Sequence, residues 1–178
     1  MKHRTLASAG LFILLALGSL TAWVATRADE RPAMPSLAGA EQWINSPALD
    51  AAALKGKVVL VDFWTWDCIN CQRSLPHVID WARKYADQGL VVIGVHTPEY
   101  DYEHDIGTLR DRVAKLGIGF PVAADNDYRI WNAWGNQFWP AHYFVDRQGQ
   151  VRYAHFGEGR YEEQERVIQA LLEERKGS

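Results

Sequence analysis

Two continuous runs of apolar residues in the middle of the chain predict strands that are buried on both faces. They are residues 58–61 and 90–95, and each is flanked by glycine or polar residues. Runs of this kind are typical of central strands in a sheet with helices on both sides. Between them, Val78, Trp81 and Tyr85 recur at helical spacing. This spacing predicts a helix that packs one face on the sheet.

The second half of the chain continues the alternation of helix and strand. Residues 103–117 have helical composition, and the chain ends in a helix with an apolar stripe. Residues 141–145 and 151–156 flank a polar turn, which predicts a β-hairpin. The order of elements therefore predicts the α/β class, with a central mixed sheet, flanking helices and an antiparallel edge.

The N-terminal segment predicts export from the cytoplasm. Lys2 and Arg4 precede an uncharged run from residue 5 to 26, long enough to cross a bilayer as a helix. The following residues offer poor small-residue pairs for signal cleavage, so we expect residues 1–26 to be an uncleaved anchor in the cytoplasmic membrane. A secreted periplasmic protein, released by cleavage, is the alternative. The basic end stays in the cytoplasm, which places the rest on the periplasmic side.

Behind the anchor we expect a linker and one domain. Residues 27–40 contain two prolines and mixed charge, as linkers do, and residues 41–178 have the length of a single domain. Hydrophobic residues make up 48% of the chain, which is enough for a packed core. The net charge of −3, with no basic cluster beyond the N-terminus, argues against nucleic-acid binding.

The two cysteines of the chain form one CxxC motif, Cys68 and Cys71. The motif follows the first predicted strand directly and opens a helix, where free backbone N–H groups and the helix dipole favour negative charge. Cys68 is therefore expected to be partly thiolate and to attack a partner disulfide. Cys71, one turn further, would resolve the mixed disulfide and should be the less exposed of the two.

Other uses of a CxxC motif fit this sequence less well. A c-type haem site requires histidine after the second cysteine, where Gln72 stands. A zinc site needs two more ligands, and His77 is the only histidine near the motif. A purely structural disulfide that closes so short a loop would stabilise the fold little. We expect no metal and no cofactor.

Asp62 lies in the first buried strand, six residues before Cys68. A carboxyl group is costly to bury, so Asp62 is a candidate general base for Cys71 during resolution. An ordinary acid at the end of a strand, with structural hydrogen bonds, is the alternative.

Five further polar residues are expected to be structural. His96 and Glu99 follow the second strand, and His142 and His155 lie within the hairpin. Asp125 starts an Asp-Asn-Asp cluster without the spacing of a calcium loop, and we expect it to cap a helix.

The segment that carries the CxxC motif resembles the active-site segment of the thioredoxin superfamily. Within that superfamily the chain is similar to the TlpA-like extracytoplasmic branch, and to the thioredoxin-like domain of DipZ-type proteins. The resemblance covers residues 40–175 and rests on Trp64-Thr65 with Cys-Ile-Asn-Cys, His96-Thr97-Pro98-Glu99, Asp125-Asn126-Asp127, Trp139-Pro140-Ala141 and Gly157-Glu158-Gly159.

The resemblance implies a thioredoxin-like fold and several site residues. Pro140 would be the cis proline beside the CxxC motif, and it would expose the backbone of Trp139 for pairing with a substrate. Trp139 and Trp66 would contact the substrate. Two departures stand out: Asp67 replaces the tryptophan that often precedes the first cysteine, and Ile-Asn replaces Gly-Pro between the cysteines.

Together these features predict an extracytoplasmic thiol–disulfide oxidoreductase that acts on protein thiols and disulfides, more as a reductant than as an oxidant. DipZ-type proteins fuse this domain to a multi-span electron-transfer domain that this chain does not carry, so we expect a separate membrane electron donor of the DsbD or CcdA kind. A thiol peroxidase is one alternative, because Thr65 and Cys68 form a TxxC pattern, although Val61 stands where proline is expected. A copper-binding chaperone is the other.

Overall fold

The computed structural model describes residues 31–174, and the predicted membrane anchor, residues 1–26, lies outside them. Within the described part, no helix is both long enough and apolar enough to cross a membrane. The helices and strands follow one another as β1 (Gln42–Ile44), β2 (Val58–Trp64), α1 (Ile69–Lys84), β3 (Leu90–His96), α2 (Ile106–Lys115), β4 (Val122–Ala124), α3 (Arg129–Ala133), β5 (Ala141–Val145), β6 (Val151–Phe156) and α4 (Tyr161–Glu173), with 3-10 turns at Ala86–Gln88 and Asp101–His104.

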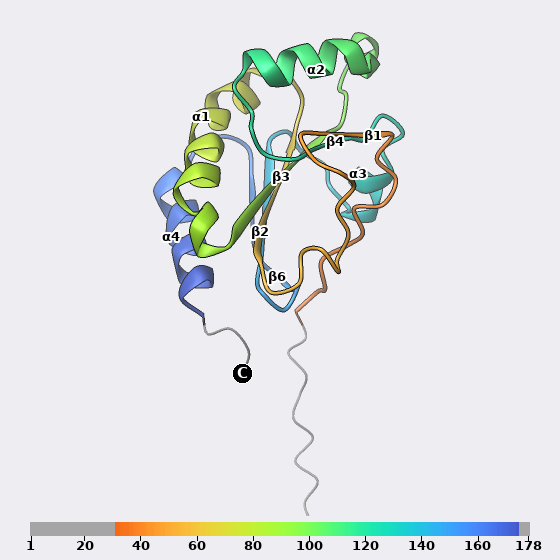
Figure 1. The fold of residues 1–178 in the computed structure, drawn as a ribbon. Coiled ribbons are helices and arrows are strands. Elements are labelled where there is room, and N and C mark those ends of the chain that lie inside the picture. Colours follow the sequence, from red (N-terminus) through yellow and green to blue (C-terminus); the bar gives the residue numbers. More distant parts are fainter. Residues whose placement is uncertain (1–30, 175–178) are drawn as a thin grey trace, which may run out of the picture. The chain divides into compact units, whose positions relative to one another are not determined.

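The strands form one mixed sheet with the order β1-β4-β3-β2-β5-β6. The pairs β2–β3 and β3–β4 are parallel, whereas β1–β4, β2–β5 and β5–β6 are antiparallel. Figure 1 shows α1 and α4 together on one side of the sheet and α3 on the other. The prediction of an α/β fold with a central mixed sheet and an antiparallel edge is confirmed.

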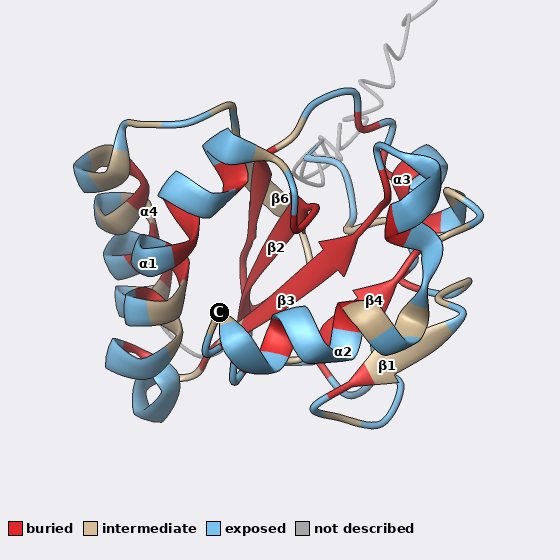
Figure 2. Ribbon diagram, turned by 90° about the horizontal axis from the view of Figure 1, so that it is seen from above, coloured by how far each residue is buried: buried red, intermediate tan, exposed pale blue. Residues whose placement is uncertain are grey.

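Strand β2 is the centre of the molecule, and all seven of its residues are buried (Figure 2). Its side chains alternate between the two faces of the sheet. Leu60 and Trp64 pack into the cluster that includes α1 and Cys71, while Val61 and Phe63 pack into the cluster on the α3 side. Two apolar cores, one on each face, therefore hold the strand that leads into the CxxC motif.

A glycine in the neighbouring strand allows this packing. A Cβ atom at Gly94 of β3 would lie 2.8 Å from Nε1 of Trp64 and 3.1 Å from a ring carbon of Phe120. A larger residue would displace one of the two rings, so glycine lets the Trp64 indole pack close to β3.

Three features differ from the sequence prediction. Strands β1 and β4 were not predicted, since three residues show no periodicity. The predicted helix over 103–117 is a 3-10 turn followed by α2, because Asp105 accepts the N–H of Thr108 and caps a new helix. Residues 31–40, expected to be linker, contact the domain: Pro32 O accepts the N–H of Val151, and Leu37 is buried. The compact unit thus begins at Arg31.

Candidate active site

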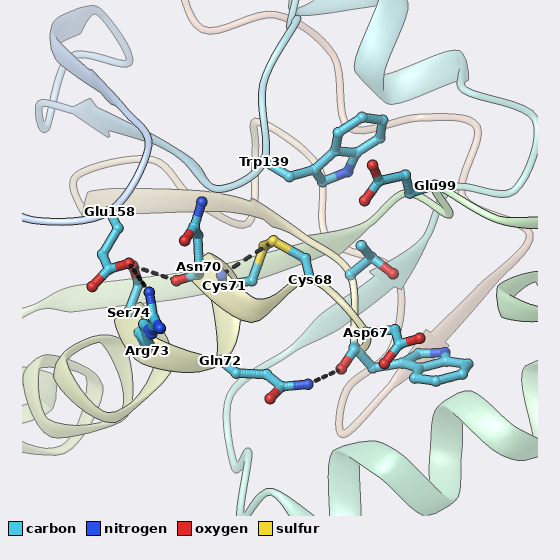
Figure 3. The surroundings of a disulfide bond; sticks show 12 residues. Asp67, Cys68, Asn70, Cys71, Gln72, Arg73, Ser74, Glu99, Trp139 and Glu158 are labelled. Carbon is cyan, nitrogen blue, oxygen red and sulfur yellow. Dashed lines mark hydrogen bonds and ion pairs between the residues drawn. A yellow bond between two sulfur atoms is a disulfide. The ribbon is translucent and has the colours of Figure 1, made fainter.

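The CxxC motif forms a disulfide at the first turn of α1 (Figure 3). Cys68 is the N-cap residue, and its sulfur accepts the N–H of Cys71 at 3.1 Å. Cys71 is buried at 3% exposure, whereas Cys68 is partly exposed. The prediction that Cys71 is the less accessible sulfur is confirmed, and an incoming thiolate meets Cys68 first.

Two side chains of the first turns of α1 connect the motif to neighbouring loops. Gln72, one residue past the motif, donates from Nε2 to the carbonyl of Trp66 at 2.9 Å. On the other side of α1, Arg73 lies 3.3 Å from the carboxylate of Glu158, in the Gly-Glu-Gly loop (Figure 3). This pair is exposed, so it contributes little to stability, but it places opposite charges beside the disulfide.

The peptide bond between Trp139 and Pro140 is cis, as the resemblance implied. Pro140 is buried and directly precedes β5, whose Ala141 pairs with Phe63 of β2. The indole of Trp139 donates to the carbonyl of Thr97 at 3.0 Å and packs on Trp131 with ring centroids 4.2 Å apart. These contacts hold the indole in place on the side of the disulfide where Figure 3 also shows Glu99.

Trp66, for which the resemblance implied a substrate contact, is largely covered. It is 7% exposed, with the guanidinium of Arg112 4.6 Å from its ring and Tyr102 at 5.4 Å. The exposed aromatic side chain at this position is Tyr102, which stacks on Tyr100. Trp66 therefore supports an exposed tyrosine pair beside the motif.

Asp67, immediately before Cys68, has a fixed partner. The hydroxyl of Tyr102 donates to its Oδ2 at 2.5 Å. This hydrogen bond raises the pKa of Tyr102 to about 12, because the neighbouring carboxylate disfavours the phenolate. The carboxylate of Asp67 is thereby held by a neutral donor next to the more exposed sulfur of the disulfide.

Glu103 organises the loops around the motif, and the sequence analysis missed it. It is 1% exposed. Its Oε1 accepts the hydroxyl of Thr65 and the N–H of Asp67, and its Oε2 accepts the N–H groups of Glu99 and Tyr100. The one signal in the sequence is its place three residues after Tyr100, where an acid can cap the start of a helical turn.

His96 belongs to the same network. Because Thr65 donates its proton to Glu103, Nε2 of His96 must donate to Oγ1 of Thr65, 3.2 Å away. Burial lowers the pKa of His96 to about 3. The expectation of a structural, hydrogen-bonded histidine is confirmed, and this histidine is neutral at physiological pH.

Asp62 is 3% exposed. Its side chain lies on the same face of the sheet as Leu60 and Trp64, which is the face that carries Cys71. Its Oδ1 lies 3.3 Å from Nε2 of His142, which is its partner in the β2–β5 register. Burial is the largest influence on the pKa of His142 and lowers it, but the contacts with Asp62 and Gln164 together raise the pKa by more, so the net direction is upward. No pattern in the sequence predicted the contact between Asp62 and His142.

The remaining candidates have structural surroundings. Asp125 accepts the N–H groups of Ile130 and Trp131 at the start of α3, as expected of a capping acid, although the N-cap position itself is Tyr128. His77 stacks on Tyr161 with ring centroids 3.7 Å apart. Among residues 31–174, no three or more histidine, cysteine or acidic side chains gather in a way that could hold a metal ion.

Comparison with known sequences identifies the family of this chain and relatives that include a thiol-disulfide oxidoreductase. The model of the AhpC/TSA family matches residues 33–154. DipZ of Mycobacterium bovis is 48% identical over 145 residues, which are 80% of this chain and 21% of DipZ. The thiol-disulfide oxidoreductase YkuV of Bacillus subtilis is 31% identical over 144 residues, covering 81% of this chain and 97% of YkuV. This chain thus spans about a fifth of DipZ but nearly all of YkuV.

Comparison with solved structures agrees on the fold. The solution structure of a thioredoxin-like protein in its oxidised form superimposes with a TM-score of 0.74 at 31% identity. The match covers 82% of this chain and 98% of the other. The thioredoxin-like arrangement of sheet and helices, which the resemblance implied, is confirmed.

Proposed function

Because this chain belongs to the AhpC/TSA family and is a thiol–disulfide oxidoreductase of the thioredoxin-like superfamily, we propose that it reduces disulfide bonds of other proteins outside the cytoplasm. The observation that carries the proposal is the unequal exposure of the two sulfurs at the start of α1. Cys68 is accessible to a partner, and Cys71 is buried behind it. This asymmetry suits a nucleophile and a resolving thiol.

In the proposed reaction the reduced pair gives two electrons to a client protein. The Cys68 thiolate attacks a client disulfide, and the second client sulfur leaves as a thiolate with the electron pair. Cys71 then passes its proton to Asp62, attacks Cys68 and releases the first client sulfur. The enzyme ends as the Cys68–Cys71 disulfide, which is the state that the structure describes.

The client would lie along the loop before β5. The backbone of Trp139, ahead of the cis Pro140, would pair with an extended client segment. The exposed side chains of Ile69 and Tyr102 border the disulfide and would contact apolar client residues. Trp66 would act from behind Tyr102.

The N-terminal segment supports both the location and the reductive direction of the proposed reaction. Its basic start and uncharged run favour a membrane anchor with the domain on the periplasmic side. Disulfides persist in that compartment, so a reductant there needs electrons from elsewhere. A separate membrane donor of the DsbD or CcdA kind would supply them. Protease accessibility of the domain in spheroplasts tests this placement, and protection from the protease would refute it.

The reduction potential of the Cys68–Cys71 couple tests the direction. We expect a value near or below about −230 mV, in the range of thioredoxin-like reductants, and a value above about −150 mV would make the protein an oxidant. The roles of the sulfurs are tested by substitution. Cys68→Ser should abolish exchange, while Cys71→Ser should trap a mixed disulfide with the client. Exchange that persists in Cys68→Ser would remove the proposed function.

A further inference from the structure

A buried histidine connects the acid behind the CxxC motif to helix α4. His142 of β5 is 0% exposed. One ring nitrogen, Nε2, faces Oδ1 of Asp62 at 3.3 Å, and the other, Nδ1, lies 2.6 Å from Oε1 of Gln164. Gln164 is itself fully buried in α4. Three polar side chains from three elements thus meet inside the apolar core, where each unpaired group would be costly.

The orientation of Gln164 decides where the histidine carries its proton. The amide nitrogen of Gln164 donates to the carbonyl of Gly159 at 2.7 Å, which turns its oxygen toward His142. An amide oxygen can only accept, so Nδ1 of His142 must carry a hydrogen. The Gly-Glu-Gly loop, through Gly159 and Gln164, therefore sets the tautomer of His142.

The remaining contact then requires one more proton. Nε2 of a neutral His142 with hydrogen on Nδ1 is an acceptor, and an ionised Asp62 offers only acceptors. Neither Nε2 nor Oδ1 of Asp62 has a hydrogen-bond partner among the described residues, and the structure pairs each of these two atoms with the other. Two acceptors 3.3 Å apart in a buried site repel each other, so a proton must lie between them.

We propose that His142 is the positioning residue for Asp62, and that the two side chains hold a single proton in common between Nε2 and Oδ1, while Gln164 and Gly159 keep the other ring proton on Nδ1. The inference rests on the proposed function, in which Asp62 takes the proton of Cys71. With the shared proton on Nε2, the carboxylate is free to accept from Cys71. With the proton on Asp62, it is not. The readiness of Cys71 to resolve the mixed disulfide therefore depends on His142.

The other groups around His142 act through charge alone. His155 of β6 is its partner in the β5–β6 register, with ring centroids 6.3 Å apart. Burial lowers the pKa of His155, and the charges of His142 and Arg160 lower it further. Glu163 of α4 opposes that effect. These effects make His155 harder to protonate than a free histidine, and its Nε2 has no hydrogen-bond partner among the described residues.

The proton count can be measured directly on the full chain by nitrogen-15 spectroscopy of the histidine rings. We expect Nδ1 of His142 to stay protonated between about pH 5 and 8, the range in which free histidine titrates. In Asp62→Asn the second proton should be lost, because the charge that held it is gone, and Nε2 should appear unprotonated throughout. An unprotonated Nδ1, or no change in Asp62→Asn, would overturn the inference.

The consequence for catalysis is tested by the pH profile of the resolving step in single turnover. His142→Gln keeps a hydrogen-bond donor toward Asp62 but cannot carry the charge. In His142→Gln we expect the acidic limb of this pH profile to move to higher pH by about one unit. At pH values below the midpoint of that limb, the resolving step should then be about tenfold slower than in the wild type. His155→Gln, on the neighbouring strand, is the matched control and should keep the original limb.

The outcomes separate the two proposals. If Cys68→Ser is inactive and His142→Gln keeps the wild-type pH profile, the inference fails and the proposed function stands. If Cys68→Ser remains active, the proposed function fails by itself. Should His142→Gln not fold, the ring spectra of the unmodified protein and of Asp62→Asn still decide the proton count.

Discussion

The buried carboxylate of Glu103 makes a strong prediction about stability. Its two oxygens accept four hydrogen bonds, from the hydroxyl of Thr65 and from the N–H groups of Asp67, Glu99 and Tyr100. In Glu103→Gln one oxygen becomes an NH₂ group of nearly the same size. Whichever way the amide turns, its NH₂ group, which can only donate, replaces an oxygen that accepted two hydrogen bonds. Packing is kept, so the effect isolates the hydrogen bonds.

The magnitude follows from the two lost contacts. Hydrogen bonds to a charged acceptor are worth about 1.5–3 kcal/mol each, and a buried donor left without a partner costs about as much. We expect Glu103→Gln to lower the free energy of unfolding by about 3 kcal/mol or more. This is a large share of the roughly 5–15 kcal/mol of a typical domain.

Urea denaturation with the disulfide kept oxidised measures the effect. The slope of the transition should stay unchanged, since the same surface is exposed on unfolding. Glu99→Gln, an exposed acid of the same loop, is the control and should change stability by less than about 0.5 kcal/mol. A Glu103→Gln protein as stable as that control would refute the reasoning.

A double-mutant cycle locates the interaction. Thr65→Val removes the hydroxyl that donates to Glu103 and accepts from His96. If the three groups form one network, the double variant should be less destabilised than the sum of the single variants, by about 1 kcal/mol. Strict additivity would mean that Thr65 and Glu103 act independently.

Two further predictions concern charge near the motif. Asp67→Asn removes the carboxylate before Cys68, which should increase the thiolate fraction of reduced Cys68, and the pKa of Tyr102 should fall from about 12 toward its ordinary value. Rates of thiol alkylation and the ultraviolet titration of tyrosine measure both, and an unchanged Tyr102 titration would contradict the assignment. His96 should make the fold acid-sensitive. Its pKa is lowered by burial from 6.5 to about 3, so the unfolded chain takes up a proton first as the pH falls. Stability should drop by roughly 1 kcal/mol for each unit below about pH 6, and His96→Gln should flatten this slope; an equal slope in both proteins would contradict it.

Local patterns in the sequence were sufficient for the frame of the active site. A continuous apolar run is typical of a strand buried on both faces, so residues 58–61 and 90–95 predicted the central position of β2 and β3. The motif directly after β2 must then open the next helix, which places Cys68 at its N-cap. The cis bond before Pro140 came from resemblance to a family, and no local pattern would have predicted it.

Contacts between distant segments could not be predicted in this way. Thr65 and Glu103 are 38 residues apart, and His142 and Gln164 are 22 apart. In the sequence each is a single polar residue without a periodic signal, and His142 looked like a structural histidine in a strand. The short strands β1 and β4 were missed for a related reason, since three residues form a strand only when a neighbour supplies the hydrogen bonds.

The sequence by itself determined which strands are central, where the reactive pair lies and which sulfur a partner meets. These properties depend on hydrophobic runs and on the free N–H groups at a helix start, both of which are local. Only the tertiary structure decided which buried polar groups face one another. A buried acid or histidine must find its partner somewhere in the core, and the register of β5 on β2 and the packing of α4 choose which one it is.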